Sequence, residues 1–208
     1  MNGIRLENVT VFLLRHGHTP ETSAGRYIGQ TDAALSAKGI RQAERWAEWF
    51  SSVPLKRIAC SGLKRSADTA AIIGRRNGVR PVMFPDLKEI DLGDWEGLEF
   101  DYVRKSFPEA YKRRGEDMAH FRPPGGESFL DLQKRVVFRF QELMQPPAND
   151  MLIVGHAGTN RVLLCHLLGM PLHNLFRLKQ DVAALNIIAV RSSGWHLEAM
   201  NLQWPLAT

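Results

Sequence analysis

The chain has only two cysteines, Cys60 and Cys165, among its 208 residues. Neither belongs to a CxxC pair, which excludes a zinc ribbon and a thioredoxin-like motif, and two cysteines are too few for a disulfide framework. Both lie in apolar stretches, where a free buried thiol is the usual state. The scarcity of cysteine therefore favours a reducing, cytoplasmic setting.

Long apolar runs are also missing. The run Val11–Leu14 is far too short for the hydrophobic core of a signal peptide or for a membrane-spanning helix, and the other apolar stretches have the length of strands. The sequence lacks an internal repeat, a low-complexity tract and a recognisable linker. We therefore expect an untargeted protein with no membrane partner, folded as a single domain over residues 1–208.

The charge is only mildly unbalanced, with 27 Lys and Arg against 22 Asp and Glu and a net charge of +5. Nucleic-acid-binding proteins gather basic residues into a patch or place aromatic residues between them, whereas the basic residues of this chain are spread out. We expect no nucleic-acid partner. Two interpretations of the basic residues stay open: a solvated surface, or arginines gathered around an anionic substrate.

Strands and helices are predicted to alternate through most of the chain. Strands are predicted at Thr10–Leu14, Lys56–Cys60, Val82–Phe84, Met151–Gly155, Ala184–Val190 and Trp195–Met200, and helices over residues 36–50, 61–76, 131–144 and 156–168. This order predicts an α/β three-layer sandwich with a mostly parallel central sheet, helices on both faces and an antiparallel final pair. Residues 86–127 are less regular and predict an insertion over one face, with a short helix near Phe100–Ser106.

Two of the predicted strands end in a histidine: His16, which follows Arg15, and His156. Ligands bind at the carboxyl ends of strands in such sheets, so the two histidines could converge. Arg15 and Arg65, which lies just after the second strand, carry planar forks of donors that match phosphate oxygens. The helix after His156 would add free N–H groups and its positive dipole end to the same ligand. These residues predict a pocket for a dianion, with a phosphate monoester as its natural guest.

Five motifs follow one another along the chain. They are Leu13–Gly17, Gly29–Ala43, Ser61–Ala70, Leu87–Gly97, and Pro124–Ser128 together with Val154-Gly155-His156. In this order they resemble the histidine phosphatase superfamily, also called the phosphoglycerate mutase-like family. The resemblance runs from about residue 10 to residue 200 and implies a phosphoglycerate mutase-like fold, with no cofactor and no metal. The insertion at residues 86–127 would lie over the active site.

The resemblance also implies catalytic roles. His16 would be the nucleophile, and Arg15, Arg65 and His156 would hold the phosphate oxygens. Glu89 would donate a proton to the leaving group and then activate water. The residues alone do not choose between Glu89 and its acidic neighbours, which are Asp91, Asp94 and Glu96; the family match selects Glu89, and Glu96 is expected to hold a loop.

Secondary contacts to phosphate are implied for Gln30, the backbone of Ala157 and Thr22. Two positions depart from the family pattern: Thr22 stands where Asn is common, and His18 stands where an acidic or amide residue is usual. His18 also suggests a rival, a metal site built from His16, His18 and His156. No carboxylate stands at a familiar metal spacing, and the family implies none, so we expect no metal.

The expected activity is hydrolysis of a small phosphorylated substrate. Compact length favours a phosphatase over a phosphoglycerate mutase, and Pro123–Ser128 and Cys165–Leu172 especially resemble α-ribazole phosphatases. Mutase-type phosphoryl transfer and a non-catalytic phospho-ligand-binding relative remain the alternatives. Lys112–Arg114 could contact a second anionic group or form a solvated stretch. Exposed edge strands leave a homodimer open.

Overall fold

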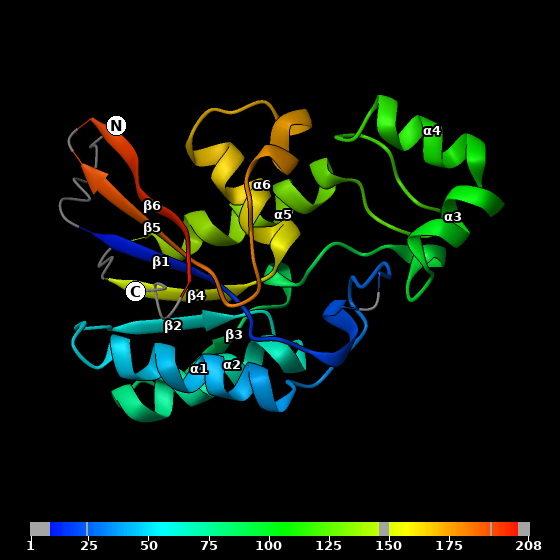
Figure 1. Ribbon diagram of the computed structural model, residues 1–208. Coiled ribbons are helices and arrows are strands. Elements are labelled where there is room, and N and C mark those ends of the chain that lie inside the picture. Colours follow the sequence, from blue (N-terminus) through cyan, green and yellow to red (C-terminus); the bar gives the residue numbers. More distant parts are fainter. Residues whose placement is uncertain (1–8, 24, 146–149, 192, 204–208) are drawn as a thin grey trace.

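The computed structural model describes residues 9–23, 25–145, 150–191 and 193–203, apart from the side chains of residues 22 and 23. A six-stranded sheet lies between two layers of helices (Figure 1). The strands are β1 (Thr10–Arg15), β2 (Arg57–Cys60), β3 (Val82–Met83), β4 (Met151–Gly155), β5 (Leu185–Arg191) and β6 (Gly194–Leu202). The α-helices are α1 (Ala37–Phe50), α2 (Lys64–Asn77), α3 (Phe100–Ser106), α4 (Pro108–Glu116), α5 (Phe129–Leu143) and α6 (Ala157–Leu167).

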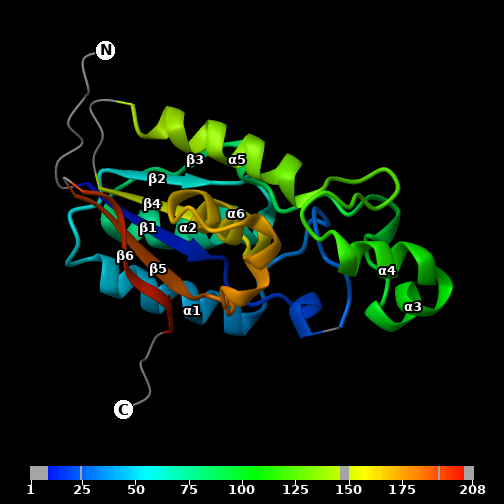
Figure 2. The ribbon, with the colours of Figure 1, turned by 90° about the horizontal axis from the view of Figure 1, so that it is seen from above.

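The sheet has the order β3-β2-β4-β1-β5-β6. Pairing is parallel from β3 through β2 and β4 to β1, and antiparallel where β5 joins β1 and β6 joins β5. The predicted fold class is therefore confirmed, including the antiparallel final pair. The carboxyl ends of the parallel strands point toward the end of the molecule where α3 and α4 lie (Figures 1 and 2).

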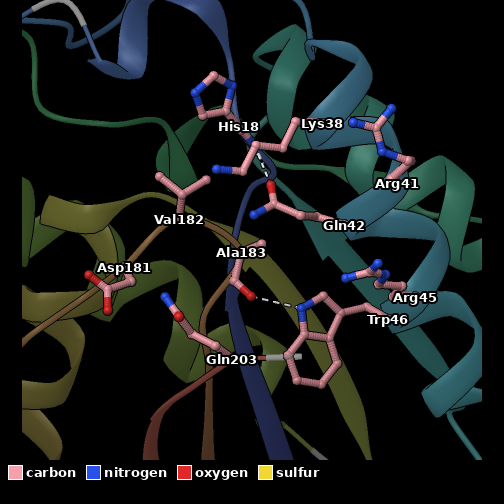
Figure 3. Close-up of a pocket in the computed structure, with 10 residues that line it drawn as sticks. All are labelled: His18, Lys38, Arg41, Gln42, Arg45, Trp46, Asp181, Val182, Ala183 and Gln203. Carbon is pink, nitrogen blue, oxygen red and sulfur yellow. Dashed lines mark hydrogen bonds between the residues drawn. The ribbon is translucent and has the colours of Figure 1, made fainter. Parts of the chain in front are cut away.

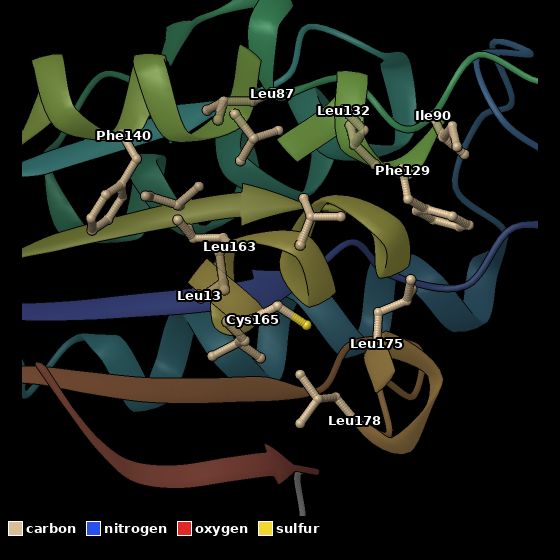
Figure 4. Packing of buried hydrophobic residues seen from close by; sticks show 14 of the residues in the cluster. Leu13, Leu87, Ile90, Phe129, Leu132, Phe140, Leu163, Cys165, Leu175 and Leu178 are labelled. Atoms are coloured by element: carbon tan, nitrogen blue, oxygen red, sulfur yellow. The ribbon is translucent and has the colours of Figure 1, made fainter. Parts of the chain in front are cut away.

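The two hydrophobic cores follow from the period-2 alternation of side chains along buried strands. Val11 and Leu13 of β1 pack into the core under α5 and α6, whereas Phe12 and Leu14 pack into the core over α1 and α2. Figure 4 shows the first of these cores, with Leu132 from α5 and Leu163 from α6 facing the sheet. Because both faces are covered, the central strands are apolar at almost every position, as such sheets require.

The first turn of α1 packs directly against the backbone of the loop that follows β1. Ser36 caps the helix by accepting a hydrogen bond from the N–H of Gly39. A Cβ atom at Gly39 would collide with the backbone of His18, so only glycine permits this close approach. Ile40, the next residue of the helix, is 42% exposed.

The insertion contains more helix than the sequence predicts. The short helix Phe100–Ser106 is confirmed as α3, but α4 follows it directly. Helix α4 begins with Pro108, which suits the first helical position, and it buries none of its residues. It therefore has no apolar stripe by which sequence periodicity could reveal it.

None of the helices in the described part of the chain combines the length and the apolar character needed to cross a membrane.

Candidate active site

Parallel pairing of β1 and β4 brings the two predicted histidines together. Arg15 is in register with Gly155, and the N–H of His16 donates to the carbonyl oxygen of Gly155 at 3.1 Å. His16 and His156 each follow the last residue of one of these adjacent strands, and their ring centroids lie 5.1 Å apart. Both side chains are buried. The convergence expected at the carboxyl ends of the strands is thus present.

Hydrogen bonds define the tautomer of His16. Its Nδ1 lies 2.8 Å from the carbonyl oxygen of Gly17, which can only accept, so Nδ1 carries the hydrogen. The Nε2 atom accepts a hydrogen bond from Nε of Arg65 at 3.2 Å. Burial, reinforced by the charges of Arg65 and Arg15, holds the pKa of His16 well below its usual range. At neutral pH the imidazole is therefore uncharged, with its lone pair on Nε2.

Arg65 and Arg15 are anchored by neutral carbonyl groups. The two terminal nitrogens of Arg65 donate to the carbonyl oxygens of Thr31 and Gly29, both at 2.6 Å. Arg15 donates to the carbonyl oxygen of Gln180 at 2.7 Å, and its buried Nε has no hydrogen-bond partner among the described residues. Because carbonyl oxygens fix these side chains without neutralising them, both positive charges remain for an anionic ligand.

His156 is oriented by Ser61. The N–H of Leu63 donates to Oγ of Ser61 at 3.2 Å, and the same Oγ lies 2.7 Å from Nε2 of His156. Among the described residues, Nε2 of His156 is the only acceptor that the Ser61 hydroxyl reaches, so the hydroxyl donates to Nε2 and the ring hydrogen lies on Nδ1. Burial and then the neighbouring His16 and arginines lower the pKa of His156 well below its usual range. Its Nδ1 is buried and has no partner in the described part of the chain, so it is a ready donor for a ligand.

The carboxylate of Glu89 lies against the N-terminus of α6. Its carboxylate accepts hydrogen bonds from the N–H groups of Gly158 at 2.9 Å, Thr159 at 3.2 Å and Ile90 at 2.9 Å. The expectation that this helix end would offer its N–H groups to the ligand is therefore wrong for Gly158 and Thr159. A Cβ atom at position 158 would collide with the carboxylate of Glu89, which explains the glycine there. The N–H groups of Gly158 and Thr159 at the positive helix end thus hold the carboxylate of Glu89.

Arg135, which the sequence reading missed, holds the segment that carries Glu89. Its guanidinium donates to the carbonyl oxygens of Asp86, Lys88 and Glu89 at 2.8–2.9 Å. It also pairs with the carboxylate of Glu127 at 2.7 Å. One arginine of α5 thus fixes the backbone of residues 86–89 beside the site, and only the folded chain reveals this role.

Glu96 holds the loop that precedes α1, as expected. Its carboxylate accepts hydrogen bonds from the N–H of Gly29 at 3.2 Å, the N–H of Gln30 at 2.7 Å and the hydroxyl of Thr31 at 2.8 Å. The carbonyl oxygens of Gly29 and Thr31 also accept hydrogen bonds from Arg65. Glu96 therefore stabilises the loop that positions Arg65.

A network of buried side-chain amides holds Gln180, the residue that anchors Arg15. Gln180, whose carbonyl oxygen receives Arg15, accepts hydrogen bonds at its side-chain oxygen from Asn186 at 2.9 Å and from Asn160 at 3.2 Å. Asn186 also donates to the carbonyl oxygen of Leu13 at 3.0 Å. Asn186 is a polar residue inside an apolar strand, which was the one visible sign of this network in the sequence.

The secondary contacts expected from the sequence are placed differently. Gln30 donates from its side chain to the carbonyl oxygen of Glu89 at 3.2 Å, and Ala157 is the first residue of α6. The side chain of Thr22 lies outside the described residues. His18 contacts Ser36 at 2.9 Å and lines a different cavity from His16. No group of three His, Cys, Asp or Glu side chains suited to a metal ion occurs among the residues that the structure describes.

A cavity of about 180 Å³ opens at the site. It is lined by Arg15, His16, Thr19, Glu21, Ile28, Arg65 and Glu89, with the exposed residues Arg26 and Phe100 at its entrance. Beside this entrance, the ring of Tyr27 lies 4.6 Å from that of Phe100 and 5.8 Å from the guanidinium of Arg114. Arg114 and Arg161 also lie over the ring of Phe176, at 5.8 and 5.1 Å. Of the Lys112–Arg114 cluster, Arg114 thus reaches the aromatic rim, whereas the other two residues are exposed.

The lowered pKa values of His16 and His156 predict a pH-dependent stability. Below about pH 6.5 the unfolded chain binds protons at these histidines and the folded chain does not, so the free energy of unfolding falls as the pH falls. Each histidine contributes a slope of up to about 1.4 kcal/mol per pH unit until its folded pKa is reached. Denaturant unfolding between pH 8 and 5 should therefore show a shallower slope for His16→Asn/His156→Asn than for the wild type.

The matched control is His166→Asn/His173→Asn, which removes two exposed histidines. It should keep the slope of the wild-type protein. Equal slopes for all three proteins would contradict the assignment of neutral, buried imidazoles.

Comparison with known proteins gives a consistent result. The sequence model of the histidine phosphatase superfamily (branch 1) matches residues 11–203. An adenosylcobalamin/α-ribazole phosphatase of Escherichia coli (strain K12) is 27% identical over 194 residues, covering 92% of this chain and 95% of that protein. A Yersinia pestis (strain Pestoides F) protein named as a probable phosphoglycerate mutase is 32% identical over 186 residues, covering 89% and 86%.

Solved structures agree with the sequence comparison. The native structure of a mycobacterial glucosyl-3-phosphoglycerate phosphatase has a TM-score of 0.85 at 29% identity, and the match covers 95% of this chain and 100% of that one. The family match spans nearly the whole described chain and includes both histidine-bearing strand ends. The chain therefore belongs to the histidine phosphatase superfamily, branch 1.

Proposed function

We propose that this protein hydrolyses phosphate monoesters through a phosphohistidine intermediate on His16. The observation that carries the proposal is the unprotonated Nε2 of His16 held against the Arg65 guanidinium, in a cavity that also contains Arg15 and Glu89. A neutral imidazole buried near two cations suits attack on the phosphorus of a phosphoryl group whose oxygens carry two negative charges.

In the first step, Nε2 of His16 attacks the phosphorus and the bond from phosphorus to the ester oxygen breaks. As the phosphate enters, Arg65 gives up its hydrogen bond to Nε2 of His16 and donates to a phosphate oxygen instead. Arg15 and the Nδ1–H of His156 supply further donors, since both have a buried nitrogen without a partner among the described residues. Donors already in place lower the cost of the charge that develops on the equatorial oxygens.

Glu89 transfers the protons. It gives a proton to the departing ester oxygen, so that a neutral alcohol leaves. As a carboxylate it then takes a proton from water, whose oxygen attacks the phosphorus, and the bond to His16 breaks to release inorganic phosphate. The amide donors from Gly158 and Thr159 keep both oxygens of Glu89 in place through the two steps.

The secondary contacts remain part of the proposal. Gln30 can reach a phosphate oxygen if it exchanges the 3.2 Å bond to the carbonyl oxygen of Glu89. The backbone N–H of Ala157, at the start of α6, and the hydroxyl of Thr22 are the other proposed donors. All three would adjust the position of the phosphate rather than carry the chemistry.

The proposed substrate is α-ribazole 5′-phosphate, which is supported by the E. coli relative named as an adenosylcobalamin/α-ribazole phosphatase. One alternative, phosphoglycerate mutase-type transfer, is supported by the Yersinia relative. The other alternative is a phospho-ligand-binding protein without turnover. The rim formed by Arg114, Tyr27 and Phe176 would contact the alcohol part of the substrate.

We also propose a cytoplasmic setting and a homodimer. The two cysteines are free and buried, which supports a reducing compartment. The edge strand β3 exposes Val82 and Met83, at 53% and 62%, and this supports the pairing of two copies. No membrane or nucleic-acid partner is proposed.

The phosphohistidine proposal predicts the effect of His16→Ala. Phosphate release from α-ribazole 5′-phosphate, 3-phosphoglycerate and p-nitrophenyl phosphate, measured in EDTA, should fall by about 10³-fold or more because the nucleophile is gone. Acid-labile labelled phosphate should be trapped on the wild-type protein by rapid quenching and be absent from the variant. The exposed control His173→Ala should behave as wild type. Comparable turnover in His16→Ala would refute the mechanism, and no release from any ester by the wild type would favour the alternatives.

The role of Glu89 predicts a dependence on the leaving group. In Glu89→Gln, kcat/KM, which reports the steps up to the departure of the alcohol, should fall by about 10²–10⁴-fold for an alkyl phosphate, since the alkoxide leaves without a proton. The loss for p-nitrophenyl phosphate should be much smaller, because that leaving group needs little protonation. Glu44→Gln, on the exposed face of α1, is the matched control. Equal losses for the two esters would show that Glu89 is not the acid.

A further inference from the structure

A second, larger cavity lies between α1 and the segment that precedes β5. Its volume is about 710 Å³, and it shares no lining residue with the catalytic cavity. Lys38, Arg41 and Arg45 of α1 form one wall, and residues 181–183 form the wall that faces them (Figure 3). The volume lies in the range of small-molecule sites, about 300–1,000 Å³. Nothing in the proposed chemistry at His16 uses this cavity.

The wall contributed by α1 is cationic and lacks counter-ions. Lys38, Arg41 and Arg45 make no ion pair with a carboxylate in the part of the chain that the structure describes. The one acidic side chain of the lining, Asp181, is already taken up by Lys179 at 2.7 Å and by Asn201 at 2.9 Å. Like charges three and four residues apart on a helix destabilise it, so these three cations favour an anionic occupant.

The spacing of the cations selects an elongated anion. Lys38 and Arg45 are seven positions apart, which corresponds to about 10 Å along the helix axis at about 1.5 Å per residue. A single phosphate would contact one or two of these side chains, whereas a chain of two or three phosphates can contact all three. Gln42 lies between them, but its side-chain oxygen already accepts the N–H of His18 at 2.9 Å, so the charged side chains supply the recognition.

The cavity has a rigid base. Trp46 is buried and donates from its indole nitrogen to the carbonyl oxygen of Ala183 at 2.7 Å. Ala183 in turn donates its N–H to the carbonyl oxygen of His16 at 3.1 Å. Figure 3 shows Trp46 and Ala183 closing the base below the basic side chains. A ligand would therefore meet a preformed surface, which reduces the entropy that binding costs.

We propose that this cavity binds a short polyphosphate chain, either free or carried by a nucleotide. The phosphates would contact Lys38, Arg41 and Arg45, and the space toward residues 181–183 would hold the remainder of the ligand. The site is separate from the catalytic cavity and does not depend on the proposed hydrolysis.

The test is calorimetric titration of the full chain with two probes, inorganic tripolyphosphate and ATP, each in EDTA at fixed ionic strength. The variant Arg41→Gln/Arg45→Gln removes two charges from the wall of the cavity. The control Arg75→Gln/Arg76→Gln removes two exposed charges from the last turn of α2. Thermal unfolding of all three proteins checks that they remain folded, as expected for exposed positions.

We expect saturable binding of at least one probe by the wild type and the control. The Kd should rise by about tenfold or more in Arg41→Gln/Arg45→Gln, because charge-assisted contacts are lost. Tighter binding of ATP would identify a nucleotide as the source of the phosphates, and equal binding would identify the free chain. The absence of saturable binding, an unchanged Kd in the cavity variant, or equal losses in both variants would overturn the proposal.

Discussion

The parallel hydrogen bonding of β1 to β4 is the constraint on which the site depends. It fixes the register in which Arg15 lies beside Gly155, and a histidine directly follows each of these two strand ends. A shift of one residue would turn every side chain of β1 to the other face and would exchange the two cores. Val11 and Leu13 belong to one core and Phe12 and Leu14 to the other, so burial on both faces enforces the register. The packing of ordinary apolar residues therefore sets the distance between His16 and His156.

The electrostatics of the site follow from this geometry. Two imidazoles are buried beside two guanidinium groups, and both effects keep the imidazoles uncharged. The arginines remain charged because carbonyl oxygens, not carboxylates, anchor them. The carboxylate of Glu89 is kept at the positive end of α6, where backbone amides hold it. A phosphate dianion that enters the cavity would meet two fixed positive charges, the uncharged imidazole of His16 and the carboxylate of Glu89.

Much of the fold was predictable because both faces of the central strands are buried. Continuous apolar runs such as Met151–Gly155 identify such strands directly, and the residues at their ends then follow from topology. What the sequence alone could not show is which backbone groups the polar side chains contact. The amides of Gly158 and Thr159 were expected to face the ligand, but they bind Glu89 across a long sequence separation. Arg135 was missed because the apolar pattern of its helix does not indicate which backbone groups its guanidinium contacts, and α4 was missed because it buries none of its residues.

The central claim is that Nε2 of His16 is the atom that bonds to phosphorus. A crystal structure of the protein with vanadate would test it most directly, because vanadate adopts the five-coordinate geometry of phosphoryl transfer. The account predicts vanadium bonded to Nε2 of His16, with oxygens within hydrogen-bond distance of Arg15, Arg65 and Nδ1 of His156 and the apical oxygen near Glu89. Vanadate bound elsewhere, or bonded to another atom of the site, would contradict it.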